Sequence, residues 1–85
     1  MNDLKSYKKK IIYKASHRGS KEMDILLGSF INKYIELFNE NELNLFDSII
    51  ECDDEEIYQW ILGKKVVPNE HQNRVFSLLL NNTQN

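Results

Sequence analysis

Residues 21–38 read KEMDILLGSFINKYIELF, with apolar side chains recurring at spacings of three and four residues. This spacing brings side chains to one face of an α-helix, so the stretch predicts a helix with one buried side. The predicted buried positions are Met23, Leu26, Leu27, Phe30, Ile31, Tyr34, Leu37 and Phe38. Gly28 and Ser29 interrupt the stretch at mid-length. Because such a pair can kink a helix, two shorter helices would also fit.

The charged turn before this helix comprises residues 17–22, His-Arg-Gly-Ser-Lys-Glu. Ser20 is suited to cap the helix that follows, and Gly19 can adopt the left-handed geometry that closes the helix before it. The net charge changes sign here, from +5 over residues 1–22 to −7 over residues 23–85. The turn is therefore the first candidate for a functional surface.

A first helix is predicted upstream of the turn, behind Asp3 as N-cap and ending near Ser16. The apolar side chains on one of its faces are Leu4, Tyr7, Ile11 and Ala15. Its other faces are basic and include Lys8–Lys10 and Lys14.

Helices are also predicted downstream, where two stretches begin with a capping-box pattern. Asn39 with Glu42 and Asp53 with Glu56 each place an N-cap residue three positions before a glutamate. Gly63 is expected to end the second of these helices. The expected inward side chains are Leu43, Phe46, Ile49 and Ile50 in the first helix, and Ile57, Trp60 and Ile61 in the second.

A last helix is predicted to open with Asn69 and Gln72 and to bury Val75, Leu78 and Leu79, with fraying from about residue 81. No stretch alternates apolar and polar residues for long enough to predict a strand. The expected fold is therefore a small all-α bundle of about five helices, formed as a single domain over residues 1–85.

Composition limits the cell compartment and the class of protein. The chain has 85 residues and a single cysteine, Cys52, which excludes an internal disulfide. Its uncharged runs are too short to span a bilayer, and its N-terminus resembles neither a secretory signal nor a transit peptide. Together with the abundance of Lys, Ile and Asn, these features lead us to expect a bacterial cytoplasmic protein with no membrane insertion.

Reactive side chains are few and poorly placed for catalysis. His71 is expected on the surface in the first turn of the last helix, and no cysteine or histidine lies near it at metal-ligand spacing. Cys52 precedes four acids, which oppose thiolate formation, so a partly buried inert thiol is expected. The acids at 53–56 are explained by helix capping, with a partner-facing acidic patch as the alternative. We expect neither a metal site nor an enzyme.

The basic N-terminal helix offers a second function class. Lys8–Lys10 and Lys14 could neutralise phosphates, which would suit a small nucleic-acid-binding or regulatory module. Against this, the isoelectric point is near 5.6 and the chain has only two arginines. A solvated or partner-facing helix is the preferred interpretation, so nucleic acid is not expected as a partner.

The turn also contains a motif, Arg18-Gly19-x-x-Glu22. Considered alone, it is equally well explained as a corner between two helices. Downstream, residues 50–54 read IECDD and residues 58–63 read YQWILG. In this combination and at this separation the chain resembles the small FAD assembly factors of succinate dehydrogenase, the SdhE or flavinator proteins.

This resemblance implies a compact bundle of about five helices that promotes covalent FAD attachment to the flavoprotein subunit of succinate dehydrogenase, and in some bacteria of fumarate reductase. The factor would act by binding and preorganising the flavoprotein. The resemblance implies that Arg18, Gly19 and Glu22 contact the flavoprotein near its FAD, flanked by His17 and Asp24. The FAD would belong to the partner. No tightly bound cofactor of the chain itself is expected, and we expect the free protein to be a monomer.

Two departures from the family pattern are visible. His17 stands where many relatives have an arginine, and Gly28-Ser29 replaces a frequent Met-Pro. The first could make the contact sensitive to pH, whereas the second should affect only the bend of the helix.

Overall fold

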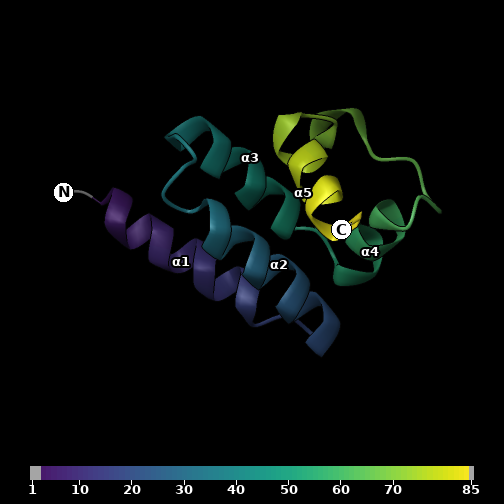
Figure 1. The fold of residues 1–85 in the computed structure, drawn as a ribbon, viewed down its shortest axis with the longest axis horizontal. Coiled ribbons are helices and arrows are strands. Elements are labelled where there is room, and N and C mark those ends of the chain that lie inside the picture. Colours follow the sequence, from purple (N-terminus) through teal and green to yellow (C-terminus); the bar gives the residue numbers. More distant parts are fainter. Residues whose placement is uncertain (1–2, 85) are drawn as a thin grey trace.

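The computed structural model describes residues 3–84 and is built from helices (Figure 1). They are α1 (Leu4–Ser16), α2 (Lys21–Tyr34), α3 (Glu40–Ile50), α4 (Asp54–Ile61), the short 3-10 helix η1 (Asn69–His71) and α5 (Arg74–Gln84). No strand occurs in this part of the chain, so the predicted all-α bundle of about five helices is confirmed. None of the helices over these residues is both long and apolar enough to cross a membrane.

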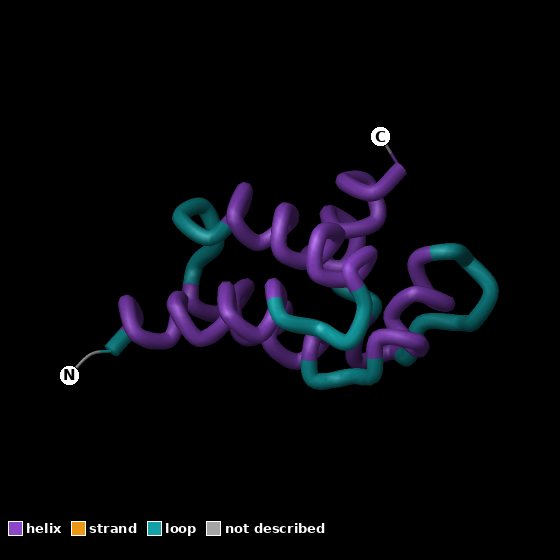
Figure 2. Tube along the Cα trace, turned by 90° about the horizontal axis from the view of Figure 1, so that it is seen from below, coloured by secondary structure: helices purple, strands orange, loops and turns teal. Residues whose placement is uncertain are grey.

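The helices surround one core. α1 packs along α2, and α3 runs alongside α1 and also contacts α5 (Figure 1). The rings of Phe30 and Phe46, which join α2 to α3, have centroids 5.5 Å apart. The segment that joins α4 to η1 projects at the end of the molecule away from the N-terminus (Figure 2). The side chains with no exposed surface are Ile11, Ala15, Leu27, Phe30, Ile31, Leu43, Phe46, Ile49, Ile57, Val75 and Leu79.

The start of α2 follows the sequence pattern, since Ser20 caps it by accepting a hydrogen bond from the Met23 amide at 3.2 Å. The helix is continuous through Gly28, so it is not split into two. Gly28 is buried, and a Cβ built on it would lie 3.0 Å from Ser16 Oγ. The glycine therefore lets the end of α1 approach α2 closely.

The end of α2 comes earlier than the apolar pattern suggests. The helix stops at Tyr34, and the chain then turns towards α3. Ile35 and Phe38 remain buried, but the predicted inward position of Leu37 is wrong, because its side chain is 73% exposed. Spacings of three and four residues place side chains on one face only while the backbone is helical, so the pattern does not apply to Leu37.

The predicted caps had mixed outcomes. The capping box at Asn39 and Glu42 is confirmed, with both reciprocal hydrogen bonds present. Asp3 and Asp53 stand at the N-cap positions of α1 and α4, but neither side chain makes a cap hydrogen bond, so the second capping box is wrong. Gly63 ends α4 as predicted. It has a φ of 76°, and its amide donates to Trp60 O at 3.1 Å.

The last helix begins later than predicted. Asn69 opens only a single 3-10 turn, and the cap of α5 is Asn73, whose Oδ1 accepts from the Phe76 amide at 3.1 Å. The helix then continues to Gln84, past residue 81, where fraying was expected. Val75 and Leu79 are buried as predicted, Leu78 is only partly buried, and Phe76 is also part of the core.

Candidate functional site

The turn between α1 and α2 is fastened to the start of α4 by one carboxylate. Asp54 Oδ1 accepts a hydrogen bond from Arg18 Nε at 2.7 Å, and Asp54 Oδ2 accepts one from the Gly19 amide at 2.8 Å. The two sequence motifs, far apart in the chain, therefore meet at Asp54. A carboxylate that accepts from a guanidinium and a backbone amide makes charge-assisted hydrogen bonds, which are stronger than neutral ones.

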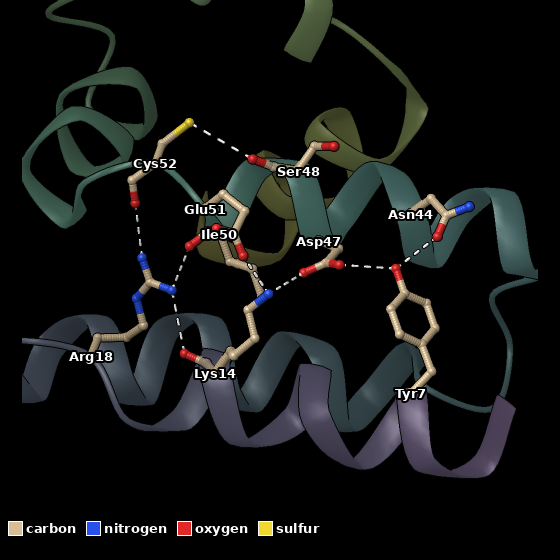
Figure 3. Close-up of polar contacts among 9 residues, drawn as sticks. All are labelled: Tyr7, Lys14, Arg18, Asn44, Asp47, Ser48, Ile50, Glu51 and Cys52. Atoms are coloured by element: carbon tan, nitrogen blue, oxygen red, sulfur yellow. Dashed lines mark hydrogen bonds and ion pairs between the residues drawn. The ribbon is translucent and has the colours of Figure 1, made fainter. Parts of the chain in front are cut away.

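The rest of the Arg18 guanidinium is also used inside the protein. Its Nη1 donates to Ile50 O at 2.7 Å and to Lys14 O at 3.3 Å, and its Nη2 donates to Cys52 O at 3.0 Å (Figure 3). Carbonyl groups near the end of a helix lack hydrogen-bond donors within the helix. The Arg18 guanidinium donates hydrogen bonds to these carbonyls. Its side chain is only 11% exposed. Arg18 is therefore not an exposed side chain of the turn, because it ties together the ends of α1 and α3 and the start of α4.

Gly19 is exposed, but it does not adopt the expected left-handed geometry. Among the glycines of residues 3–84, only Gly63 has a positive φ. Glycine suits position 19 because the backbone lies close to the Asp54 carboxylate. A Cβ at this position would lie 3.3 Å from Asp54 Oδ2. The absence of a side chain at Gly19 thus allows its backbone to approach Asp54 closely.

Asp24 also holds the turn, because its Oδ1 accepts a hydrogen bond from the Arg18 backbone amide. His17 is exposed and stacks on Tyr13, with ring centroids 4.0 Å apart and its Nδ1 3.0 Å from Tyr13 O. Glu22 is exposed and makes no hydrogen bond or ion pair with other described residues. Of the five predicted contact residues, Arg18 and Asp24 therefore shape the turn. Gly19, Glu22 and His17 are presented to solvent.

A polar cluster along the facing sides of α1 and α3 was missed from the sequence. Tyr7 Oη lies 3.0 Å from Asp47 Oδ2 and 2.7 Å from Asn44 Oδ1 (Figure 3). Lys14 Nζ donates to Asp47 Oδ1 at 2.6 Å and pairs with Glu51. These bonds join α1 to α3, and the hydrogen bonds to Asp47 and Glu51 raise the pKa of Lys14. The available signal was Asp47 and Glu51 at i and i+4, a spacing that places both carboxylates on one helical face.

The cluster also weakens the nucleic-acid interpretation of the basic helix. Lys8 is paired with Glu36 at 3.1 Å, and Lys14 is paired with Asp47. Each of these two lysines has a carboxylate partner within the protein, which leaves less of the basic helix's charge for phosphates. No observation over residues 3–84 favours nucleic-acid binding as a second function.

His71 is buried, which shows that the predicted surface position is wrong. Its side chain packs against Trp60, with ring centroids 5.5 Å apart, and its Nε2 lies 3.5 Å from Cys52 Sγ. The expectation depended on a helix that starts at Asn69. The actual 3-10 turn points the imidazole inward instead.

Cys52 is half-buried and unsuited to nucleophilic chemistry. Burial raises the pKa of its thiol, with further contributions from the nearby negative charges of Glu70 and Asp53. Arg18 opposes this shift but does not reverse it. The thiol therefore stays protonated, as its sequence neighbours suggested.

Two surface grooves meet at Gly19. One is lined by residues of α1 and the α3–α4 junction, including His17, Arg18 and Cys52. The other, with a volume of about 460 Å³, is lined by Gly19, Ser20, Glu22, Met23, Asp54, Glu55 and Tyr58. Within the described residues, no three side chains of His, Cys, Asp or Glu are grouped to hold a metal ion. The two grooves together form a continuous surface around the turn.

Comparison with known proteins shows which proteins this chain is similar to. A family model described as flavinator of succinate dehydrogenase matches residues 9–83. Succinate dehydrogenase assembly factor 2, mitochondrial, from Dictyostelium discoideum is 32% identical over 85 residues, which is 100% of this chain and 60% of that protein. Assembly factor 2-B from Drosophila mojavensis is 35% identical over 78 residues, covering 89% of this chain and 50% of that protein. The chain thus spans about half to three-fifths of the length of these relatives.

The expected bacterial cytoplasmic location is wrong in the light of these relatives. The Dictyostelium and Drosophila proteins are eukaryotic, and their names describe them as mitochondrial. The expectation rested on the single cysteine, the N-terminal sequence and the abundance of Lys, Ile and Asn, and these features carry little information about the compartment in which a folded domain works.

Proposed function

The chain belongs to the family of succinate dehydrogenase flavinators, and from this membership we propose that it assists the covalent attachment of FAD to the flavoprotein subunit of succinate dehydrogenase. The fumarate reductase flavoprotein, where one is present, is a second target under the same proposal. FAD belongs to the partner in this scheme. The chain contributes a surface and not a reacting group.

The observation that carries the proposal is the fastening of Arg18 and Gly19 by Asp54. Because both motif residues are held by one carboxylate, the turn keeps its shape before any partner binds. Glu22 follows in the first turn of α2, exposed and without a hydrogen-bond or ion-pair partner among residues 3–84. The motif therefore divides into a part that sets the shape and a part that is available to the flavoprotein.

A rigid surface of this kind can accelerate a reaction in its partner. If it binds the flavoprotein in the conformation that places the flavin next to the residue that bonds to it, the barrier falls because the reacting groups are already oriented. Such an effect needs no nucleophile or base from the factor. The protonated Cys52 thiol and the solvent-exposed, Tyr13-stacked His17 are consistent with that role.

The test is covalent flavin yield. The flavoprotein subunit is co-expressed with the chain, denatured and separated on a gel, and its bound flavin is measured by fluorescence. We expect wild type to raise the yield and Glu22→Gln to lose most of that gain. Glu40→Gln is the matched control, since Glu40 is also an exposed glutamate in the first turn of a helix.

The outcomes separate the two parts of the proposal. If Glu22→Gln, shown to be folded by circular dichroism, supports as much covalent flavin as wild type, the role assigned to Glu22 is overturned. If wild type neither binds the flavoprotein nor changes its covalent flavin, the proposed function itself is overturned.

A further inference from the structure

We propose that the surface formed by α2, α4 and the end of α5 is a docking groove for a protein segment that presents a basic side chain beside an aliphatic or aromatic one. The inference rests on the proposed function, because the flavoprotein subunit is taken as the protein that carries this segment. It extends the contact beyond the turn, to a surface centred on Glu22, Ile25 and Tyr58.

The groove is concave and partly apolar. Ile25 is 64% exposed, and Tyr58 of α4 is 38% exposed. A depression of about 400 Å³ lies between them, and its lining is Glu22, Ile25, Leu26, Ser29, Tyr58, Asn82 and Thr83. A scattered exposed isoleucine is normal on a protein surface. Here the side chain borders a hollow formed by three helices, a shape that a partner side chain can fill.

This hollow is continuous with the groove beside Gly19, since Glu22 and Tyr58 line both. The residues that line the two include three carboxylates, those of Glu22, Asp54 and Glu55, and no lysine or arginine. Asp54 is occupied by Arg18 and Gly19, and Glu55 accepts a hydrogen bond from Gln59 at 2.8 Å. Glu22 is the carboxylate left without a partner among the described residues, so a cation brought to this surface would pair with it.

The distance between Glu22 and Ile25 indicates which partner segment can occupy the groove. Glu22 and Ile25 are three residues apart on α2, so their Cβ atoms lie about 5–6 Å from each other on one helical face. A partner segment matches both when its basic and apolar side chains are similarly close. Residues at i and i+3 or i+4 of a helix, or at i and i+2 of a strand, meet this condition.

A second copy of this chain fits the surface less well. In a two-fold dimer the same patch faces itself, so the acidic groove of one copy would meet the acidic groove of the other. Nucleic acid would be repelled by the same charges. Charge complementarity therefore selects a protein segment with a positive side chain.

The experiment measures binding of the full chain to the purified flavoprotein subunit by calorimetry. Ile25→Ser should weaken binding at least tenfold, and Glu22→Lys should weaken it more through charge repulsion. Leu37→Ser is the matched control, because Leu37 is equally apolar and 73% exposed at the turn after α2. We expect it to change the affinity less than twofold.

A photo-crosslinking amino acid at position 25 then identifies the occupant by mass spectrometry. The proposal requires a cross-linked flavoprotein peptide with Lys or Arg within four residues of an apolar side chain. It is overturned if Ile25→Ser binds like Leu37→Ser, or if the cross-link joins two copies of this chain. If Glu22→Gln weakens binding but Ile25→Ser does not, the proposed function stands and only this inference falls. If wild type does not bind the flavoprotein, both fall.

Discussion

Asp54 accepts a hydrogen bond from Arg18 Nε at 2.7 Å across 36 residues of sequence. The Gly19 amide donates a second hydrogen bond to the same carboxylate. Together the two contacts hold the interhelical turn against the start of α4. The fixed separation of the two sequence motifs thus corresponds to a contact in the folded protein. Any change at either end should disturb the other.

Asp54→Asn should lower the free energy of unfolding by about 2–3 kcal/mol. An asparagine offers one acceptor oxygen and one NH2 group, so either Arg18 or the Gly19 amide loses its acceptor. Both side chains of the ion pair are largely shielded from solvent, which increases the cost. Urea denaturation at neutral pH measures the difference.

Asp53→Asn is the control for this substitution, because it makes the same chemical change one residue earlier. The Asp53 side chain is exposed and makes no cap hydrogen bond. Its effect should stay within about 0.5 kcal/mol. Equal effects of the two substitutions would show that Asp54 does not hold the turn.

Asn73→Ala should cost about 1 kcal/mol, the usual effect of removing an N-cap side chain. The reason is that Asn73 Oδ1 accepts from the Phe76 amide at the start of α5. Asn69→Ala should cost less, since Asn69 begins only the short turn η1. Thermal denaturation of the two variants compares them, and a larger loss in Asn69→Ala would contradict the observed start of α5.

Gly28→Val should destabilise the protein by about 1–3 kcal/mol, the usual range for overpacking a core. The first added carbon would lie 3.0 Å from Ser16 Oγ and 3.6 Å from Ser16 Cα, and the two methyl groups of valine have no room to avoid α1. Gly28→Ala should change stability little. Its gain in helix propensity, about 1 kcal/mol, offsets a contact that rotation of the Ser16 hydroxyl relieves.

Urea denaturation compares Gly28→Val with Gly28→Ala through the urea concentration at which half of each protein is unfolded. If Gly28→Val were as stable as Gly28→Ala, the close approach of α1 to α2 at this position would be refuted.

Stability should fall at high pH in part through Tyr7. Burial and the hydrogen bond to Asp47 raise the pKa of Tyr7 to about 12, from 10.0. The folded protein therefore holds this proton more tightly than the unfolded chain does. The resulting stabilisation is complete below pH 10 and is lost as the pH rises from about 10 towards 12.

Tyr7→Phe removes this contribution, so its free energy of unfolding should depend less steeply on pH than that of wild type between pH 9 and pH 11. Lys14, whose pKa is also raised, contributes a decline in the same direction to both proteins. Urea denaturation across this pH range measures both slopes. Parallel curves would show that Tyr7 is not coupled to Asp47 in the folded state.

The elements that the sequence predicted well are those specified by local rules. Ser20, the box at Asn39 and Glu42, and the end of α4 at Gly63 act through backbone groups within a few residues of themselves. The errors have a common origin. Leu37 and the start of α5 were assigned by extending a local pattern past the point where packing of the whole chain ends or delays the helix.

The sequence singled out the residues of the candidate site as a prediction, but it did not indicate the structural role of each one. His17, Arg18, Gly19, Glu22 and Asp24 were all identified from the turn and its motif. Arg18 and Asp24 hold the turn, whereas the other three residues are exposed. This difference depends on contacts that form only in the folded chain, such as the hydrogen bond from Arg18 to Ile50 O. No local pattern predicts that a turn arginine will satisfy the carbonyls at the end of another helix.

The sequence alone was enough to predict the all-α fold and the family. Helical periodicity, caps and the two motifs each depend on residues that are close together in the sequence. Tertiary packing decided that Asp54 fastens the turn, that His71 is buried beside Cys52, and that Glu22 is exposed on the same helix as Ile25. Each of these facts depends on which surfaces meet when distant helices exclude water from one core. That outcome is a property of the packed chain as a whole.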